Sequence, residues 1–244
     1  MSANKVTAAM IMGAGLGTRM RPLTDDKPKP LVTVGGTTLI DHSIDRLVAA
    51  GVTLVVVNLH YKAEMLRSHL ARRHDVEIVF SDETDKLLDT GGGVVKAMPY
   101  FGERPFFVLN SDSIWIENGA PVLSAMLAQW NESRMDGFLL LAEMQTALGY
   151  EGTGDFALKP DGRLIRARDA KSGDAVYAYP GVQIAHPQMF VDAPEGAFST
   201  NIMWDRAITH GRLSGTVMNG TWIHVGTPEA RDEAEATLAA LSAA

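Results

Sequence analysis

A glycine-rich segment with clustered cations, residues 13–29, is the strongest chemical signal in the sequence. Three glycines and four cations stand in it: Gly13, Gly15, Gly17, Arg19, Arg21, Lys27 and Lys29. Glycine allows the backbone to approach a ligand closely and to direct N–H groups at phosphate oxygens. Arginine and lysine supply charged donors for the same oxygens. We therefore predict that this segment, called the glycine loop below, binds phosphate groups.

Two common phosphate-binding loops do not describe the glycine loop. A Walker A loop requires Gly-Lys-Ser/Thr after its glycines, and none follows here. A dinucleotide fingerprint starting at Gly13 would have Thr18 in place of its third glycine. The remaining alternative is a glycine-rich turn with solvated charges, which the clustering of cations in a chain of net charge −7 disfavours.

Asp112 is the carboxylate that best fits a metal site. It follows the apolar run 106–109 and the polar pair Asn110-Ser111. An aspartate that caps a turn is the alternative. Magnesium in phosphoryl chemistry is held by one or two carboxylates together with substrate oxygens. We therefore predict that Asp112 binds Mg²⁺ next to the phosphates of a substrate.

Strands and helices alternate through the first half of the chain, and this pattern sets where the loop and the carboxylate lie. Predicted strands and helices follow one another at 7–12, 38–50, 53–57, 61–73, 76–80, 106–109, 121–130 and 137–142. Such alternation indicates an α/β fold, a Rossmann-like mixed and mainly parallel sheet flanked by helices. Ligands bind beyond the carboxyl ends of such strands, so the glycine loop and Asp112 share one edge.

The second half of the chain follows a different pattern. A hairpin is predicted over 155–168, a strand over 177–185 and helices over 203–210 and 227–241. No linker divides the chain, so we predict one domain over residues 1–244. The change near residue 149 separates two halves within it.

Composition restricts the class of protein. The net charge of −7 disfavours a nucleic-acid partner, which requires a broad basic surface. The chain contains no cysteine, which excludes disulfides and thiolate metal sites and fits a reducing compartment. No apolar run is long enough to span a membrane. We expect a cytoplasmic protein without a membrane partner, either a monomer or a small homo-oligomer.

Several motifs together resemble one family. The glycine loop, with GxGTRMRPLT followed by KPKPL, is similar to the signature of the sugar-phosphate nucleotidyltransferases. Similar family motifs recur as DTGGG at 89–93, NSD at 110–112, GDF at 154–156 and WIHVGTP at 222–228. The resemblance covers nearly the whole chain and implies the nucleotide-diphospho-sugar transferase type of fold. It also implies the transfer of a nucleotidyl group from a nucleoside triphosphate to a sugar 1-phosphate.

The resemblance assigns roles to individual residues. It implies catalytic roles for Arg19, Lys29 and Asp112. The implied nucleotide-binding residues are Gly13, Ala14, Gly15, Gly17, Thr18, Arg19, Lys29, Asp89, Thr90, Gly91, Gly92 and Asn110. The implied sugar-binding residues are Asn110, Gly154, Asp155, Gly181 and Asn201. Residues 1–148 then form a nucleotide-binding half, and residues 149–244 form a sugar-binding half with the C-terminal helix.

His224 departs from the family pattern, which usually has a second metal-binding aspartate there. Magnesium prefers oxygen ligands to imidazole. Asp112 could hold the metal with phosphates and water, with His224 nearby; the site could tolerate Mn²⁺; or His224 could bind a phosphate instead. A packed histidine is a further alternative. A catalytically weak nucleotide-sugar sensor is also compatible with this residue.

The choice of substrates rests on overall resemblance. It favours UTP and N-acetylmuramate 1-phosphate, a reaction of cell-wall recycling, with mannose, heptose or glucose 1-phosphate as alternatives. Arg21-Pro22-Leu23 disfavours a molybdopterin nucleotidylyltransferase, which has glycine after Arg-Met. A nicotinamide dehydrogenase would require an acidic residue at the end of the second strand, where Asn58-Leu59-His60 stands.

Overall fold

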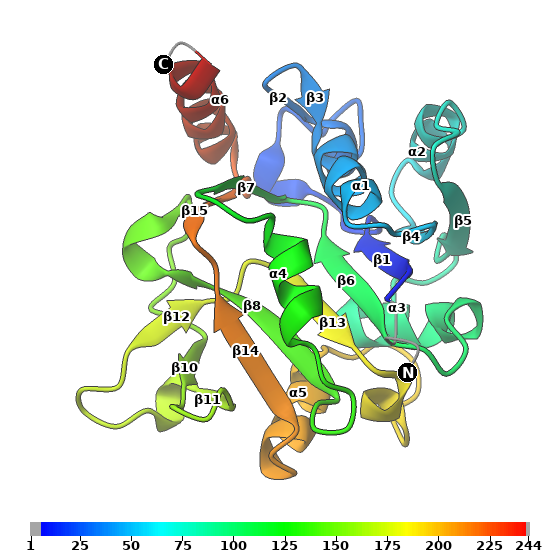
Figure 1. Cartoon of the computed structure of the whole chain (residues 1–244). Coiled ribbons are helices and arrows are strands. Elements are labelled where there is room, and N and C mark those ends of the chain that lie inside the picture. Colours follow the sequence, from blue (N-terminus) through cyan, green and yellow to red (C-terminus); the bar gives the residue numbers. More distant parts are fainter. Residues whose placement is uncertain (1–5, 243–244) are drawn as a thin grey trace.

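The computed structural model describes residues 6–242, and a large mixed sheet runs through it (Figure 1). Four strands pair in parallel in the order β6-β1-β4-β5. They are β1 (Ala8–Met12), β4 (Leu54–Leu59), β5 (Glu77–Asp82) and β6 (Phe106–Asn110). Since these strands are parallel, their carboxyl ends lie at one edge, where the glycine loop leaves β1.

The sheet continues beyond β6 through strands of the second half. There β13 (Val182–Ala185) lies antiparallel between β6 and β8 (Gly137–Glu143). On its other side, β8 pairs in parallel with β14 (Leu213–Val217). β12 (Val176–Ala178) connects β8 to the hairpin of β10 (Phe156–Leu158) and β11 (Leu164–Arg166). The predicted fold class, a mixed and mainly parallel sheet with flanking helices, is confirmed.

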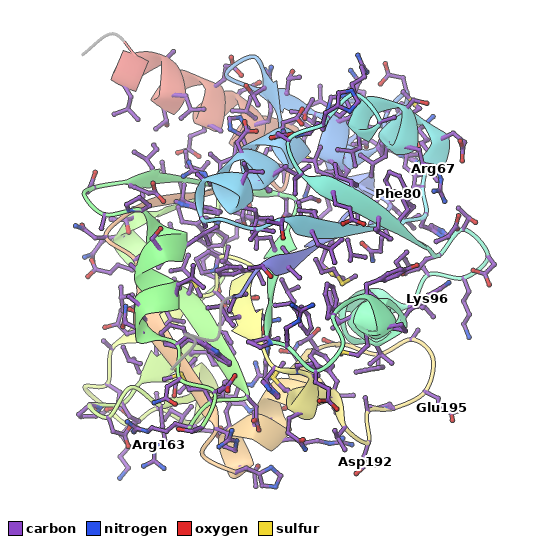
Figure 2. All side chains as sticks on the ribbon, turned by 45° about the vertical axis from the view of Figure 1, so that its right-hand side comes forward. Arg67, Phe80, Lys96, Arg163, Asp192 and Glu195 are labelled. Atoms are coloured by element: carbon purple, nitrogen blue, oxygen red, sulfur yellow. The ribbon has the colours of Figure 1, made fainter. Side chains whose placement is uncertain are left out.

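Helices cover both faces of the sheet because the side chains of its strands alternate. Ile11 of β1 contributes to the core beneath α1 (Leu39–Ala49), α2 (Ala63–Leu70) and α4 (Val122–Gln129). Met10 contributes to the opposite core with α3 (Asp89–Ala97) and α5 (Asn201–Thr209). Figure 2 shows Arg67 of α2 beside Phe80 of β5, with the guanidinium 4.9 Å from the ring centroid.

Two smaller sheets complete the fold. β7 (Ser113–Glu117), β15 (Gly220–His224) and β9 (Ala147–Leu148) form one, and β2 (Thr33–Val34) pairs with β3 (Thr37–Thr38) in the other. The β15–β7 register pairs His224 with Ser113, which follows Asp112 directly. α6 (Pro228–Ser242) follows β15 and stands at the margin of the molecule, where its Arg231 donates to Thr33 O of β2.

The observed elements differ from the sequence predictions at several points. Strands β7, β9 and β14 are not among the predicted ones. The strand predicted over 177–185 is interrupted at residues 179–181, so β12 and β13 are separate. The predicted hairpin over 155–168 is confirmed. α3 begins at Asp89, so the glycines of the DTGGG motif lie inside a helix.

Among residues 6–242, no helix is both long and apolar enough to cross a membrane.

Candidate active site

A cavity of about 410 Å³ opens beyond the carboxyl ends of β1, β4 and β6. Residues 12–20 form one wall, Lys29 and Pro30 another, and residues 110–112 at the end of β6 a third. Asp89 and Thr90 border it at the start of α3. The fold thus brings together the two segments that the sequence places at one sheet edge.

The glycine loop presents a row of backbone donors without protein acceptors. Gly13 N and Ala14 N donate to Asn58 Oδ1, at 2.7 and 3.3 Å. The N–H groups of residues 15–19 donate to no acceptor within residues 6–242. All five of these residues line the cavity. Consecutive free N–H groups around a hollow are the arrangement that binds anions.

Buried side chains hold the far side of the glycine loop in place. Gly17 has a φ of 65°, a conformation that favours glycine, and its carbonyl accepts from Thr24 Oγ1 at 2.8 Å. Met20, in a short 3₁₀ turn, is fully buried in a core formed with β2, β7 and β15. The loop is therefore anchored on both sides of its free donors.

Only two of the four cations in the glycine loop line the cavity. They are Arg19 and Lys29. The Lys29 Nζ atom lies 2.8 Å from Asp112 Oδ2 and is largely shielded from solvent. Arg21 instead forms an exposed pair with Asp25, at 3.4 Å. The positive charge available to a bound anion comes from Arg19 and Lys29.

Asp112 stands between two basic groups. Besides Lys29, the His224 Nε2 atom lies 3.4 Å from Asp112 Oδ2. The other ring nitrogen of His224, Nδ1, lies 3.3 Å from Gly149 O, and the ring stacks on Trp222. Burial by itself would raise the pKa of Asp112, but the hydrogen bond with His224 and the charge of Lys29 together hold it well below its usual range. Asp112 is thus an anion at neutral pH.

The donors around Asp112 fit a magnesium site that relies on substrate oxygens. Within residues 6–242 there is no cluster of three or more His, Cys, Asp or Glu side chains that could hold a metal alone. In the same part of the chain, Oδ1 of Asp112 accepts no hydrogen bond. One hard oxygen remains available there, and phosphate and water oxygens would complete the shell.

The structure gives Gly91 and Gly92 a role other than the predicted nucleotide contact. Neither lines the cavity, and both N–H groups donate to Phe198 O, at 2.8 and 3.2 Å. Nearby, the backbone N–H of Thr200 donates to Thr90 Oγ1 at 2.9 Å. Figure 2 shows the segment that carries Asp192 and Glu195 running beside α3, and the same segment leads to Phe198. Asp89 and Thr90, in contrast, are exposed to the cavity.

Close packing explains why residues 91–93, the glycines of DTGGG, have no side chains. A Cβ at Gly91 would lie 2.3 Å from the Phe198 ring, and one at Gly92 would lie 2.2 Å from Gly196 O. A Cβ at Gly93 would lie 2.9 Å from Glu83 Oε1. The first turns of α3 are therefore enclosed on two sides. The glycines of the motif are therefore packing residues, and only its first two residues, Asp89 and Thr90, line the cavity.

Asp155, one of the predicted sugar-binding residues, is held by two tyrosines. Asp155 Oδ2 accepts from the Tyr150 hydroxyl at 2.9 Å and from Tyr179 N at 2.8 Å. Burial, and then the charge of Asp155, raise the pKa of Tyr150 to about 12. Tyr150 lines a second cavity of about 350 Å³, which shares Arg19 and Gly226 with the first and also includes His224.

Three further predicted sugar-binding residues lie around the interruption of the strand at 179–181: Asn110, Gly154 and Gly181. Asn110 N donates to Gly181 O at 2.7 Å, and Asn110 lines the first cavity. Gly154, with a φ of 103°, packs against Val176. Asn201 begins α5, where its Nδ2 bonds to Ser199 Oγ, and it lines neither cavity. The structure does not bring Asn201 to the other site residues.

Sequence reasoning missed three residues beside the site: Asn58, Glu83 and Tyr150. Asn58 was considered only because it is not acidic, yet it holds the start of the glycine loop. Glu83 lies in a polar segment and is nevertheless fully buried. Tyr150 precedes the GDF motif and contacts its aspartate. Of the three residues, only Asn58 directly follows a predicted strand, 53–57, and this position could have identified it as a site residue.

Comparison with known proteins gives a consistent family. The Nucleotidyl transferase family model matches residues 8–240. A Caulobacter vibrioides protein named N-acetylmuramate alpha-1-phosphate uridylyltransferase is 48% identical over 236 residues, 95% of this chain and 96% of that protein. A Neisseria meningitidis protein of the same name is 34% identical over 232 residues, 93% and 96% of the two chains.

Solved structures share the fold at low sequence identity. The inositol-1-phosphate CTP transferase from T. maritima superposes with a TM-score of 0.76 at 17% identity, covering 95% of this chain and 97% of that one. A UDP-glucose pyrophosphorylase complexed with UDP-glucose superposes with a TM-score of 0.77 at 15% identity, covering 96% and 98%.

Proposed function

The chain belongs to the nucleotidyl transferase family, and we propose that it transfers the uridylyl group of UTP to N-acetylmuramate α-1-phosphate and releases pyrophosphate. The two named relatives span nearly all of the chain and supply the choice of base and sugar. The product would be UDP-N-acetylmuramate, and the reaction would serve cell-wall recycling.

One observation carries the proposal: a row of free backbone donors lies beside a paired lysine and aspartate. Residues 15–19 offer their N–H groups, and the Lys29–Asp112 pair borders the same cavity. Backbone donors in this arrangement match a polyphosphate, whose oxygens carry several negative charges. An anionic side chain beside them is useful only if a cation bridges it to the phosphates.

The reaction is an in-line displacement at the α-phosphorus of UTP. An oxygen of the sugar 1-phosphate attacks, a new P–O bond forms, and the bond to pyrophosphate breaks. Two anions must meet, so the protein has to position them and neutralise their charge. No covalent intermediate with a side chain is needed.

Lys29 and Arg19 divide the task of charge neutralisation. Lys29 is held by its neighbouring prolines and by Asp112, so its ammonium is fixed beside the cavity. We assign it to the α-phosphate and the sugar phosphate. Arg19 lies on the exposed rim of both cavities and is assigned to the departing pyrophosphate.

Asp112 is the residue proposed to hold Mg²⁺, with His224 beside it. A bound ion there would neutralise charge on the phosphate oxygens and polarise the reacting phosphorus. His224 places both ring nitrogens near protein oxygens, which leaves the role of principal ligand to Asp112. Mn²⁺ could replace Mg²⁺ at this site.

The two ends of the substrates are assigned to opposite sides of Asp112. Asp89 and Thr90 face the nucleotide at the border of the first cavity. Asp155 keeps one carboxylate oxygen engaged by Tyr150 and Tyr179 and offers the other to sugar hydroxyls. Asn110, between the cavity and Gly181, is assigned to the contact shared by ribose and sugar.

Pyrophosphate release tests the proposal directly. Purified protein with Mg²⁺ should release pyrophosphate from UTP and N-acetylmuramate 1-phosphate, and should do so less efficiently with CTP, GTP or dTTP. Mannose, heptose and glucose 1-phosphates complete the panel. Preference for another pair would assign another sugar nucleotide. Tight binding of UDP-sugars without any pyrophosphate release would instead indicate a sensor.

The variant His224→Asp tests the metal assignment. A second carboxylate beside Asp112 restores the usual family pattern and should preserve or raise Mg²⁺-dependent turnover, since oxygen is the ligand that Mg²⁺ prefers. A folded variant without activity would show that the imidazole itself is required. The magnesium concentration that gives half-maximal rate is the quantity to compare.

Mannose 1-phosphate guanylyl transfer is the second candidate. A Hypocrea jecorina mannose-1-phosphate guanyltransferase is 44% identical over 110 residues, but these cover only 43% of this chain. A cytoplasmic location and a monomeric or small homo-oligomeric state are further parts of the proposal. Cell fractionation and size-exclusion chromatography would test them.

A further inference from the structure

A buried pair of polar side chains connects the glycine loop to the start of α3. Asn58 Oδ1 accepts from Gly13 N and Ala14 N, and Asn58 Nδ2 donates to Glu83 Oε1 at 2.8 Å. The second oxygen of Glu83, Oε2, accepts from Leu88 N at 3.0 Å. The hydrogen bonds thus run without interruption from one wall of the cavity to the other.

Both side chains of the pair are buried, and each of their side-chain oxygens accepts a hydrogen bond. Asn58 is 2% exposed and Glu83 is 0% exposed. Within residues 6–242, no cation forms a salt bridge with Glu83, so amide donors alone stabilise its carboxylate. Gly93 packs closely against both side chains: a Cβ there would lie 2.9 Å from Glu83 Oε1 and 3.1 Å from Asn58 Nδ2. A buried carboxylate held this way has little freedom to move.

We infer that Asn58 and Glu83 are positioning residues for the nucleotide: they fix the glycine loop relative to Asp89 and Thr90, and so set the affinity for the triphosphate. The inference rests on the proposed function. Asn58 reaches the lining of the cavity but is only 2% exposed, and Glu83 is fully buried and does not line it. Each acts through backbone groups that it holds.

The direction of the peptide groups explains how the pair would act. Asn58 turns the N–H groups of Gly13 and Ala14 toward the sheet, and the free donors begin at the next residue. Glu83 fixes Leu88, whose neighbours Asp89 and Thr90 line the cavity. The phosphates of a nucleotide would therefore contact the glycine loop and its base would contact Asp89 and Thr90, at a fixed distance between the two segments. A loss of that separation weakens binding without removing any contacting group.

Exchanging the two functional groups provides the test. Asn58→Asp keeps the acceptor for Gly13 but removes the donor to Glu83. Glu83→Gln leaves one oxygen for two donors. In the double variant, the carboxylate introduced at position 58 accepts from Gly13 and from the amide introduced at position 83, and the oxygen of that amide accepts from Leu88. Asn58→Asp sets two buried carboxylates against each other, and Glu83→Gln sets two amide N–H groups against each other. The double variant restores a donor–acceptor pair between the two positions and keeps the wild-type net charge.

The expected result is a specific change in nucleotide affinity. Each single variant should raise the KM for UTP by roughly tenfold, the effect of one lost buried hydrogen bond, with the KM for the sugar 1-phosphate changed less than about twofold. The double variant should return to within about threefold of the wild type. Calorimetric titration with UTP, CTP, GTP and dTTP gives the dissociation constants independently of turnover. Recovery in the double variant is the readout that a general packing defect would not produce.

Asp136→Asn is the matched control. Asp136 is also a buried carboxylate, paired with Arg212 Nε at 2.8 Å, but it precedes β8 at the sheet edge opposite the cavity. This variant should lower the unfolding temperature and leave the KM for UTP near the wild-type value. An increase in KM equal to that of Glu83→Gln would overturn the inference.

Other outcomes separate this inference from the proposed function. Folded single variants with wild-type nucleotide affinity, or a double variant no better than the weaker single one, would overturn the positioning role. If one single variant does not fold, the other and the double variant decide. A wild-type protein that releases no pyrophosphate contradicts the proposed function, while titration with the triphosphate that it binds most tightly still tests the pair.

Discussion

The two glycine-rich segments of this protein use glycine for opposite purposes. In the glycine loop, residues 15–19 line a cavity, and their N–H groups find no acceptor in the described part of the chain. In residues 91–93, the first two N–H groups are engaged by Phe198, and every missing side chain makes room for a neighbour. Glycine content alone therefore does not identify a phosphate site. The availability of the backbone donors does.

The distribution of charge reinforces the difference. Lys29 and Arg19 border the cavity beside the free donors. At the start of α3 the buried group is instead a carboxylate, Glu83, and the exposed residues are Asp89 and Thr90. The local charge therefore favours an anion beside the glycine loop and disfavours one at the start of α3. Substitutions in the two segments should therefore differ in what they change.

Lys29→Ala should have the largest effect. In the proposed reaction this fixed charge lies where two anions meet, so its removal should lower turnover by at least about 100-fold. Lys27→Ala is the matched control, because Lys27 belongs to the same KPKP motif but does not line the cavity. Steady-state rates of pyrophosphate release give the comparison. Equal losses in the two variants would contradict the assignment of Lys29.

Gly91→Ala should act on stability. The added Cβ would lie 2.3 Å from the Phe198 ring, so the free energy of unfolding should fall by about 1–3 kcal/mol. Urea denaturation measures the loss. Phe198→Leu in the same chain should relieve part of it, because the smaller side chain gives way. A Gly91→Ala variant of unchanged stability and impaired UTP binding would mean that the segment contacts the nucleotide directly.

Gly15→Ala should show the converse behaviour. A Cβ at Gly15 meets no protein atom within 4 Å, so the free energy of unfolding should stay near the wild-type value. The methyl group would protrude beside the free donors and weaken UTP binding by roughly tenfold, comparable to one lost hydrogen bond. Titration with UTP tests this. Unchanged affinity would indicate that the phosphates lie elsewhere along the loop.

Arg21→Ala should have the smallest effect. Arg21 forms an exposed pair with Asp25, and such pairs contribute about 0–1 kcal/mol to stability. Turnover should stay within about twofold of the wild type. Arg19→Ala, two positions earlier and inside the cavity lining, provides the contrast. A large loss of turnover in Arg21→Ala would show that the ion pair opens when the substrate binds.

Much of the fold could be predicted because local patterns determine it. The buried strands β1, β4 and β6 are short apolar runs, and α1 begins at its capping residue Thr38. The strands β7 and β14 could not be predicted in the same way. Each is completed by a partner far along the chain, β15 for β7 and β8 for β14. β14, with the sequence LSGTV, has no apolar run, and the apolar run of β7 is only three residues long, 114–116.

In the candidate site, too, some features follow from local sequence and others depend on distant contacts. The sequence by itself determined which residues could carry charge, that the glycine loop follows a buried strand, and that Asp112 follows another. Only the tertiary structure decided which backbone donors remain free. The acceptors that engage Gly13 and Gly91 belong to Asn58 and Phe198, which are distant in the sequence. A hydrogen bond forms only within about 3 Å, so the fate of each donor depends on which acceptor the packed chain brings to it.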